Sequence, residues 1–375
     1  MRKIYRSVVL PRVVFIPYLF ARITLELLDI FTFRRFKQPN RKRTRLCIES
    51  GIKGWELIEY KELFSSAIEY LGSDRVSKVA INKESSYVQQ VACAVRQYKP
   101  THYVYDARTG DQHWLQGLIQ AFRISILFQW HGVVPICTLT DLPVRSWRTQ
   151  VAVVSAKRGV VVSLMSPRDI SSIFPHRRLV GPLTMPFSTK TLNYINTLVR
   201  YKTKSSESQS LIFTGSLYEP RTTILNEISQ GLRSHGIVLE MKGRELGSKK
   251  FSDEEYWARL VNATMVITTA NQIVSNQTDW AWLPHLIYRY LEVPATGAVL
   301  VAQEVPSLER FFVPGVHYIS YKNSNDAIEK IEYFWRKPEE ISRIAFEGNK
   351  KARSIIESNS YWVCVDIGLR NHPLL

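Results

Sequence analysis

Short apolar runs alternate with longer amphipathic stretches through residues 46–200. The amphipathic stretches predict helices at 60–71, 87–98 and 114–123. The apolar runs predict strands at 46–49, 79–81, 103–106, 125–130, 151–155 and 160–165. Because apolar strands that alternate with helices are buried on both faces, this pattern indicates an α/β domain with a parallel sheet between two helical layers.

A polar stretch rich in serine and lysine, residues 201–210, has a composition typical of linkers. The strand and helix pattern restarts directly after it, with strands expected at 211–213, 238–241, 265–268, 298–302 and 317–321 and helices at 221–234 and 285–291. We therefore expect an N-terminal domain over 46–200 and a C-terminal domain over 211–375 that ends in a helical tail. Two doubly wound domains would place a ligand in a central cleft, at the carboxyl ends of the strands.

Residues 1–45 form a basic amphipathic segment with twelve Lys or Arg and only two acidic residues, Glu26 and Asp29. Charges and prolines interrupt its apolar runs, so a transmembrane helix or a signal peptide is not expected. The segment either lies on an anionic membrane surface or packs on the body of the protein with its charges solvated. Four scattered cysteines without CxxC pairs favour reduced thiols and a cytoplasmic protein, peripheral to the inner membrane face if the first alternative holds.

Two motifs in the C-terminal half predict an anion site. In the first, Gly215 and Ser216 follow an apolar strand and Arg221 lies one turn into the next helix. A glycine turn at a helix start presents free N–H groups, and a guanidinium there can grip a diphosphate with two parallel hydrogen bonds. The alternative for Arg221 is an ordinary charge on a helix surface.

The second motif contains Arg289, Glu292, Thr296 and Gly297. Glu292 is expected near the carboxyl end of its helix, where the helix dipole disfavours an anion, so a specific partner such as a ribose diol would explain it. The alternative is a weak ion pair between Glu292 and Arg289 within the helix.

The second motif continues with further elements in a fixed order. These are Val305-Pro306-Ser307-Leu308-Glu309-Arg310-Phe311-Phe312, Gly315, Tyr318 and Ile344-Ala345-Phe346-Glu347-Gly348. Together with the glycine turn, residues 211–365 resemble the CgeB-like (spore-maturation-type) branch of the group 1 glycosyltransferases, which have the GT-B fold of two facing Rossmann-like domains. Residues 1–200 match that family only as an α/β half of suitable length.

The resemblance implies roles for individual residues. Gly215, Ser216 and Arg221 would hold the donor diphosphate, Glu292 the ribose, and Thr296 with Gly297 the phosphate side of the pocket. Arg289 belongs to the same donor motif, and Arg244 would meet the base or the diphosphate. Many relatives carry a second glutamate where this chain has Pro284, which leaves a retaining or an inverting outcome open.

The sequence has no Asp-x-Asp triplet, so we expect no metal and no cofactor. Cationic side chains and helix dipoles would stabilise the departing diphosphate instead. A general base is expected at the carboxyl edge of the N-terminal sheet, with His131 first and Asp106 second, although strand-end residues of these types more often satisfy loop backbone.

These observations predict a metal-independent glycosyltransferase that moves a sugar from a nucleotide-sugar donor to a hydroxyl of a cell-surface or lipid-linked glycan. A polyol-phosphate transferase of the same shape is one alternative. The net charge of +17 leaves a nucleic-acid-binding protein as another, although the chain contains no known nucleic-acid-reading motif. The sugar, the nucleotide and the oligomeric state are not predicted.

Overall fold

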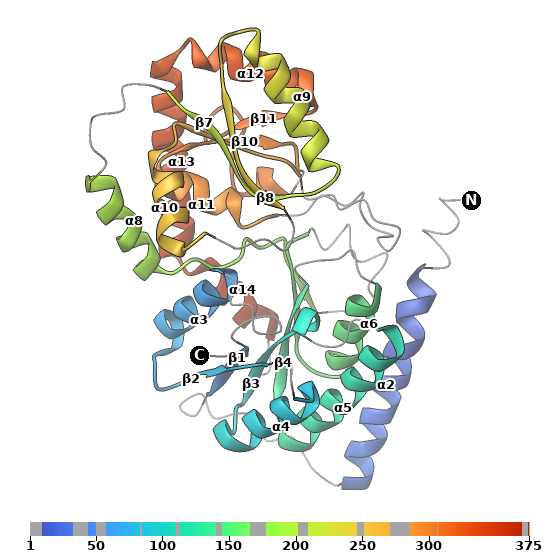
Figure 1. Ribbon diagram of the computed structural model, residues 1–375. Helices are drawn as coiled ribbons and strands as arrows, with labels where there is room; N and C mark the ends of the chain where they lie inside the picture. The colour runs from blue at the N-terminus through green and yellow to red at the C-terminus, as the bar shows by residue number, and fades with distance from the viewer. Residues whose placement is uncertain are drawn as a thin grey trace. The chain divides into compact units, whose positions relative to one another are not determined.

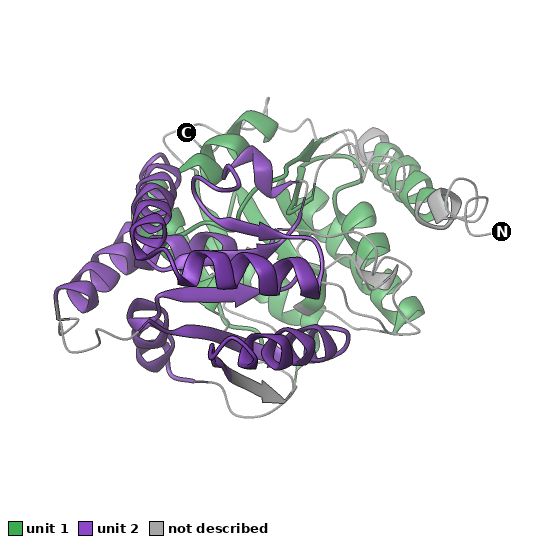
Figure 2. Ribbon diagram, turned by 90° about the horizontal axis from the view of Figure 1, so that it is seen from above, with its two compact units in different colours: residues 1–188, 359–375 green, residues 189–358 purple. Residues whose placement is uncertain are grey.

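A computed structural model describes residues 10–32, 44–49, 58–82, 85–109, 113–139, 145–165, 178–201, 209–245, 251–270, 286–305, 307–369 and 374. The chain forms two compact units, residues 1–188 with 359–375 and residues 189–358 (Figure 2). This division differs from the expected one at 201–210. Helix α8 (Thr189–Tyr201) belongs to the second unit, and the last helix, α14 (Ser360–Leu369), returns to the first.

The first unit contains a six-stranded sheet in the order β2-β1-β3-β4-β5-β6, and all neighbouring pairs are parallel (Figure 1). Its strands are β1 (Leu46–Glu49), β2 (Val76–Val79), β3 (His102–Asp106), β4 (Val134–Leu139), β5 (Val160–Ser163) and β6 (Leu179–Val180). Its other helices are α2 (Leu10–Thr32), α3 (Ile58–Leu71), α4 (Tyr87–Tyr98), the 3-10 turn η3 (Ala107–Thr109), α5 (Trp114–His131) and α6 (Arg145–Val154).

Two predicted strands of the first unit are wrong. Residues 125–130 form the second half of α5, and residues 151–154 belong to α6. The strand next to β3 is instead β4, whose proline at position 135 weakened its strand pattern. Apolar runs of this length fit a buried helix as well as a buried strand, so periodicity alone could not separate them.

The second unit contains a five-stranded parallel sheet in the order β11-β10-β9-β7-β8. Its strands are β7 (Leu211–Leu217), β8 (Leu239–Glu245), β9 (Met265–Thr268), β10 (Val299–Gln303) and β11 (Ile319–Tyr321). Its helices besides α8 are α9 (Arg221–Arg233), α10 (Asp253–Asn262), α11 (Arg289–Thr296), the 3-10 turn η4 (Leu308–Arg310), α12 (Ser324–Trp335) and α13 (Pro338–Glu357).

Each unit has its own apolar core around its sheet. In the first, Trp362 and Val365 of α14 pack with strand residues such as Ile48 and Ile136. In the second, apolar residues of α9, α12 and α13 pack on β7, β9 and β10. Both sheets are therefore doubly wound and parallel, as the sequence predicted.

Both sheets reverse their winding direction at one point. The chain leaves β7 toward β8 on one side, and it leaves β9 toward β10 on the other. The corresponding pair in the first unit is β1 and β3. Open α/β sheets bind ligands at the carboxyl ends of such strand pairs, so these two places are where a site is expected.

Candidate functional site

The glycine turn lies at the winding reversal of the second sheet. Gly215 and Ser216 are in the last part of β7, and α9 begins four residues after Leu217 with Arg221. Gly215 has φ = 147°, and a Cβ there would lie 3.0 Å from Nη1 of Arg289. Only glycine adopts this backbone conformation without strain, and its missing side chain leaves space for the Arg289 guanidinium.

Arg221 is a buried cation that joins β7 to β9. Its Nη1 donates to the carbonyl of Ser216 (2.9 Å), and its Nε donates to Oγ1 of Thr269 (3.0 Å), directly after β9. The guanidinium lies 4.3 Å from the centre of the Tyr218 ring. None of the described carboxylates pairs with Arg221. Burial, with the nearby charge of Arg289, therefore lowers the pKa of its guanidinium.

Arg289 lies beside it at the first residue of α11. Its Nη1 donates to the carbonyl of Thr214, and its Nη2 donates to the Tyr256 hydroxyl (3.2 Å). Its Nε is 3.8 Å from Oε2 of Glu292. Burial alone would lower the pKa of Arg289, but Tyr256 and Glu292 raise it above its ordinary value. The buried Arg221 and the partly buried Arg289 therefore lie close together, and among the described carboxylates Glu292 lies beside Arg289.

Glu292 lies in the first turn of α11, not near its carboxyl end. The dipole argument from the sequence is therefore wrong in sign, because a helix start stabilises an anion. The side chain is 2% exposed, and the Tyr256 hydroxyl donates to its Oε2 at 2.6 Å. Tyr256, from α10, was missed by the sequence interpretation because no local pattern links it to a helix 33 residues later.

A second residue that the sequence did not single out is Tyr290. Its side chain is fully buried, and its hydroxyl has no hydrogen-bond partner among the residues that the structure describes. Burial raises the pKa of this phenol, and the nearby positive charge of Arg221 opposes that shift. A protonated phenol therefore lies near the buried cation with an O–H donor still available.

The structure separates Thr296 and Gly297 from these residues. They end α11 and lead into β10, so they lie at the amino edge of the parallel sheet, whereas Gly215 lies near its carboxyl edge. The Thr296 hydroxyl donates to the carbonyl of Val293 (2.7 Å), and Gly297 is the left-handed residue that ends the helix. Both have structural roles in ending α11, and their position at the amino edge does not favour the predicted phosphate contact.

Arg244 is placed by strand register alone. It pairs with Ser216 in the β7–β8 ladder, so it lies at the same carboxyl edge as the glycine turn. Pro284 and the tryptophans at 280 and 282 lie outside the described residues. Among the described residues, no three His, Cys, Asp or Glu side chains gather as metal ligands do.

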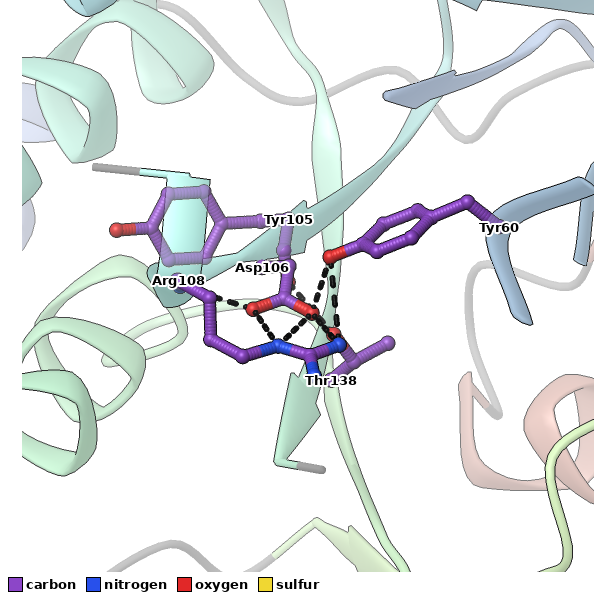
Figure 3. Close-up of polar contacts among 5 residues, drawn as sticks. All are labelled: Tyr60, Tyr105, Asp106, Arg108 and Thr138. Carbon is purple, nitrogen blue, oxygen red and sulfur yellow. Dashed lines mark hydrogen bonds and ion pairs between the residues drawn. The ribbon is translucent and has the colours of Figure 1, made fainter. Parts of the chain in front are cut away.

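The two candidate bases of the first unit have different surroundings from those expected. Asp106 ends β3, is buried, and forms an ion pair with Arg108 (2.8 Å) while accepting from the Tyr60 hydroxyl (2.6 Å), as Figure 3 shows. Burial would raise the pKa of Asp106, but the Arg108 charge and these hydrogen bonds hold it below its ordinary value. A carboxylate stabilised in this way is a weak base.

His131 is the last residue of α5, not the residue after a strand. It precedes β4, which starts at Val134, so it lies at the amino edge of the first sheet. The expectation that it points to the carboxyl edge is therefore wrong. The error follows from the apolar second half of α5, which resembled a strand.

Comparison with known proteins places the second unit in a functional context. Residues 242–361 match the model of a family described as glycosyl transferase-like. No curated protein sequence matches the chain. The matched range contains Arg244, Arg289 and Glu292, but it begins after the glycine turn.

Several solved structures resemble the whole chain at low sequence identity. HepE from Anabaena, in complex with UDP and glucose, is 10% identical with a TM-score of 0.58 and covers 85% of this chain and 99% of its own. A glycosyltransferase from Rickettsia africae is 10% identical with a TM-score of 0.57, covering 88% and 99%. Sucrose-phosphate synthase from Thermosynechococcus elongatus is 10% identical with a TM-score of 0.56, covering 86% and 97%. The fold is therefore of the GT-B type, with two Rossmann-like domains.

Proposed function

We propose that this protein is a glycosyltransferase that binds a nucleotide-sugar donor at the carboxyl edge of its second sheet. The observation that carries the proposal is a pair of guanidinium groups, the buried Arg221 and the partly buried Arg289, at the winding reversal of that sheet. Among the described residues, two positive charges lie beside one carboxylate, so a bound diphosphate would neutralise the excess positive charge of the site. The glycosyl transferase-like family match over the same unit supports this assignment.

The proposed reaction requires no covalent intermediate with the protein. The bond between the sugar and the diphosphate breaks while an acceptor hydroxyl attacks, and negative charge grows on the leaving diphosphate. Fixed cations in a site with little water stabilise that charge more in the transition state than in the ground state. We assign this role to Arg221, with Arg289, Arg244 and the Tyr290 hydroxyl as further donors, and we propose that no metal is required.

The ribose is assigned to Glu292. Its carboxylate already accepts a hydroxyl hydrogen bond, from Tyr256, in the way that a ribose hydroxyl would donate one. HepE was crystallised with UDP-glucose, so a UDP-sugar is the first donor to test. The acceptor is proposed to be a hydroxyl of a cell-surface or lipid-linked glycan, and the sugar a hexose.

Neither His131 nor Asp106 is given the role of base in this proposal. His131 lies at the wrong edge of its sheet, and the pKa of Asp106 is low because Arg108 neutralises it. Catalysis is attributed to positioning and to charge stabilisation. The cytoplasmic location and the contact of residues 1–45 with the inner membrane face are retained as proposals, and donor binding does not depend on them.

The test is a thermal-shift panel of UDP, GDP and CDP conjugates together with inorganic diphosphate. A ligand that binds only the folded state raises the melting temperature. A shift with one nucleotide-sugar supports the proposal, and a shift only with a CDP-alditol supports the polyol-phosphate alternative. No shift with any nucleotide, with salt-sensitive binding of arbitrary DNA, would refute both and favour a nucleic-acid-binding protein.

A Glu292→Gln variant sharpens this test. It keeps the shape of the side chain but removes the charge that accepts from the ribose diol. We expect weaker UDP binding and unchanged inorganic diphosphate binding. Equal losses for both ligands would contradict the ribose assignment.

A further inference from the structure

Helix α2 has apolar residues on two opposite faces. Tyr18, Ala21 and Leu25 are buried where α2 packs against the rest of the first unit, mainly on α6. The opposite face carries Ile16, Phe20, Ile23 and Leu27, which are 67%, 63%, 49% and 48% exposed. Helices that are apolar almost all round are normally covered on every side, whereas the described residues leave these four side chains of α2 largely exposed.

Helix α5 carries a second exposed apolar stripe. Its members recur every three or four residues and therefore share one face: Leu115, Ile119, Phe122, Ile126 and Trp130. Four of them are 38–51% exposed, and Trp114 at the start of the helix is 46% exposed. The solvent-exposed face of α5, which would be polar in most helices that cover a sheet, is thus apolar.

The two stripes meet. The rings of Phe20 and Phe122 are in edge-to-face contact, with 5.5 Å between their centres. Figure 1 shows α2, α5 and α6 side by side in the first unit, as their packing contacts require. The outer residues of α2 and the stripe of α5 therefore form one continuous surface, which we name the α2–α5 surface.

We propose that the α2–α5 surface inserts shallowly into an anionic lipid bilayer and holds the protein on it. The charge of the chain segments that contain the two helices selects this partner. Residues 1–45 carry twelve Lys or Arg against two acidic residues, and α5 has Arg123 and no acidic residue. A second copy of the chain is disfavoured as the occupant, because a two-fold contact would bring two strongly basic segments together.

The type of apolar residue agrees with a bilayer interface. Phe20, Trp114 and Trp130 are aromatic, and aromatic side chains favour the boundary between lipid tails and headgroups. None of the helices seen in the described ranges has both the length and the apolar character that a bilayer crossing requires. The helices would lie in the plane of the membrane surface, with basic side chains at the phosphate level.

Co-sedimentation of the full chain with lipid vesicles tests this proposal. We expect binding to mixed phosphatidylcholine–phosphatidylglycerol vesicles, weaker binding at high salt, and little binding to phosphatidylcholine alone. The double variants Phe20→Ser/Ile23→Ser and Leu115→Ser/Ile119→Ser each remove two exposed side chains and should lower the partition coefficient about tenfold or more. Phe346→Ser is the matched control, because Phe346 is 66% exposed but lies on α13 of the other unit.

Three outcomes would overturn the proposal. The first is no binding of the wild-type protein to anionic vesicles. The second is unchanged vesicle binding by the α5 double variant, which would remove α5 from the surface. The third is a dimer in analytical ultracentrifugation that both double variants dissociate, without vesicle binding.

Unchanged melting temperatures of the variants exclude misfolding as a cause of lost vesicle binding. Their thermal shift with UDP should equal that of the wild type. Failure of the membrane proposal is therefore distinguishable from failure of donor binding.

Discussion

Each of the two sheets has a buried charged side chain near its carboxyl edge, at the winding reversal. The two charges differ in whether an opposite charge lies beside them. In the first unit, Asp106 at the end of β3 is neutralised by Arg108 and hydrogen-bonded by Tyr60. In the second, Arg221 at the start of α9 has a carbonyl and a hydroxyl as its hydrogen-bond partners among the described residues, with a second guanidinium nearby. A buried charge that has its counter-ion is costly to unpair, whereas one without a counter-ion is suited to a ligand that brings the opposite charge.

The largest effect is expected when the ion pair between Asp106 and Arg108 in the first unit is broken. Asp106→Asn removes the buried carboxylate that pairs with the partly buried Arg108, and removing one partner of a buried pair costs about 3 to 5 kcal/mol. We expect the free energy of unfolding in urea to fall by about that amount. UDP affinity of the folded variant should not change, and a loss of affinity would give Asp106 a part in the donor site.

The complementary change in the second unit is Arg221→Met. It removes a buried cation that pairs with no described carboxylate, so stability should change by less than about 1 kcal/mol. UDP affinity should fall roughly 100-fold, or about 3 kcal/mol, because a desolvated charge contact is lost. Isothermal titration measures the affinity. If Arg221→Met lost much stability but kept its UDP affinity, Arg221 would have a structural role and not a binding role.

Two glycines with positive φ sharpen the comparison within the second unit. Gly215→Ala strains the backbone and places a Cβ 3.0 Å from Nη1 of Arg289. Gly297→Ala strains the backbone at the opposite edge, where a Cβ meets nothing within 4 Å. Each should cost about 1 to 3 kcal/mol of stability.

Only Gly215→Ala should weaken UDP binding, by about tenfold, because it displaces the Arg289 guanidinium. The midpoint of urea unfolding and the UDP dissociation constant check the two effects separately. Equal weakening by Gly297→Ala would restore that residue to the phosphate pocket.

The smallest effect is in the pH dependence of stability. The pKa of folded Asp106 is below its ordinary value of about 3.9, so the pair contributes fully above that value and loses its contribution as pH falls toward the folded pKa. The stability advantage of the wild type over Asp106→Asn should therefore shrink by roughly 0.3 kcal/mol between pH 7 and pH 4. An advantage that grows on acidification would contradict the lowered pKa.

The fold was more predictable than the site. Helix 87–98 and strands 46–49 and 265–268 have the predicted bounds, because caps, turns and apolar periodicity are local signals. The second half of α5 was mistaken for a strand because it is rich in apolar residues on several sides. Whether an apolar run becomes a helix or a strand depends on its pairing with distant strands and on long-range packing. The local sequence pattern does not contain this information.

The site could be predicted in part. The glycine turn with Arg221 and the helix with Arg289 and Glu292 were found in the sequence, and the structure brings Gly215 and Arg289 together. The roles of Tyr256 and Tyr290 were missed, since a buried phenol has the same sequence signature whether it packs or binds. The sequence motif does not show that α11 runs away from the carboxyl edge of the sheet. Thr296 and Gly297, at the far end of that helix, were therefore assigned to the same edge as Arg289.

Residues 359–375 return the chain from the second unit to the first. Because α14 completes the core of the first unit through Trp362, Val365 and Leu369, the polypeptide passes between the units twice, after residue 188 and after residue 358. A fragment cut at residue 188 would expose the apolar core side chains that α14 covers. If the two units were produced as separate chains, residues 359–375 would have to be joined to residues 1–188 for the first unit to fold.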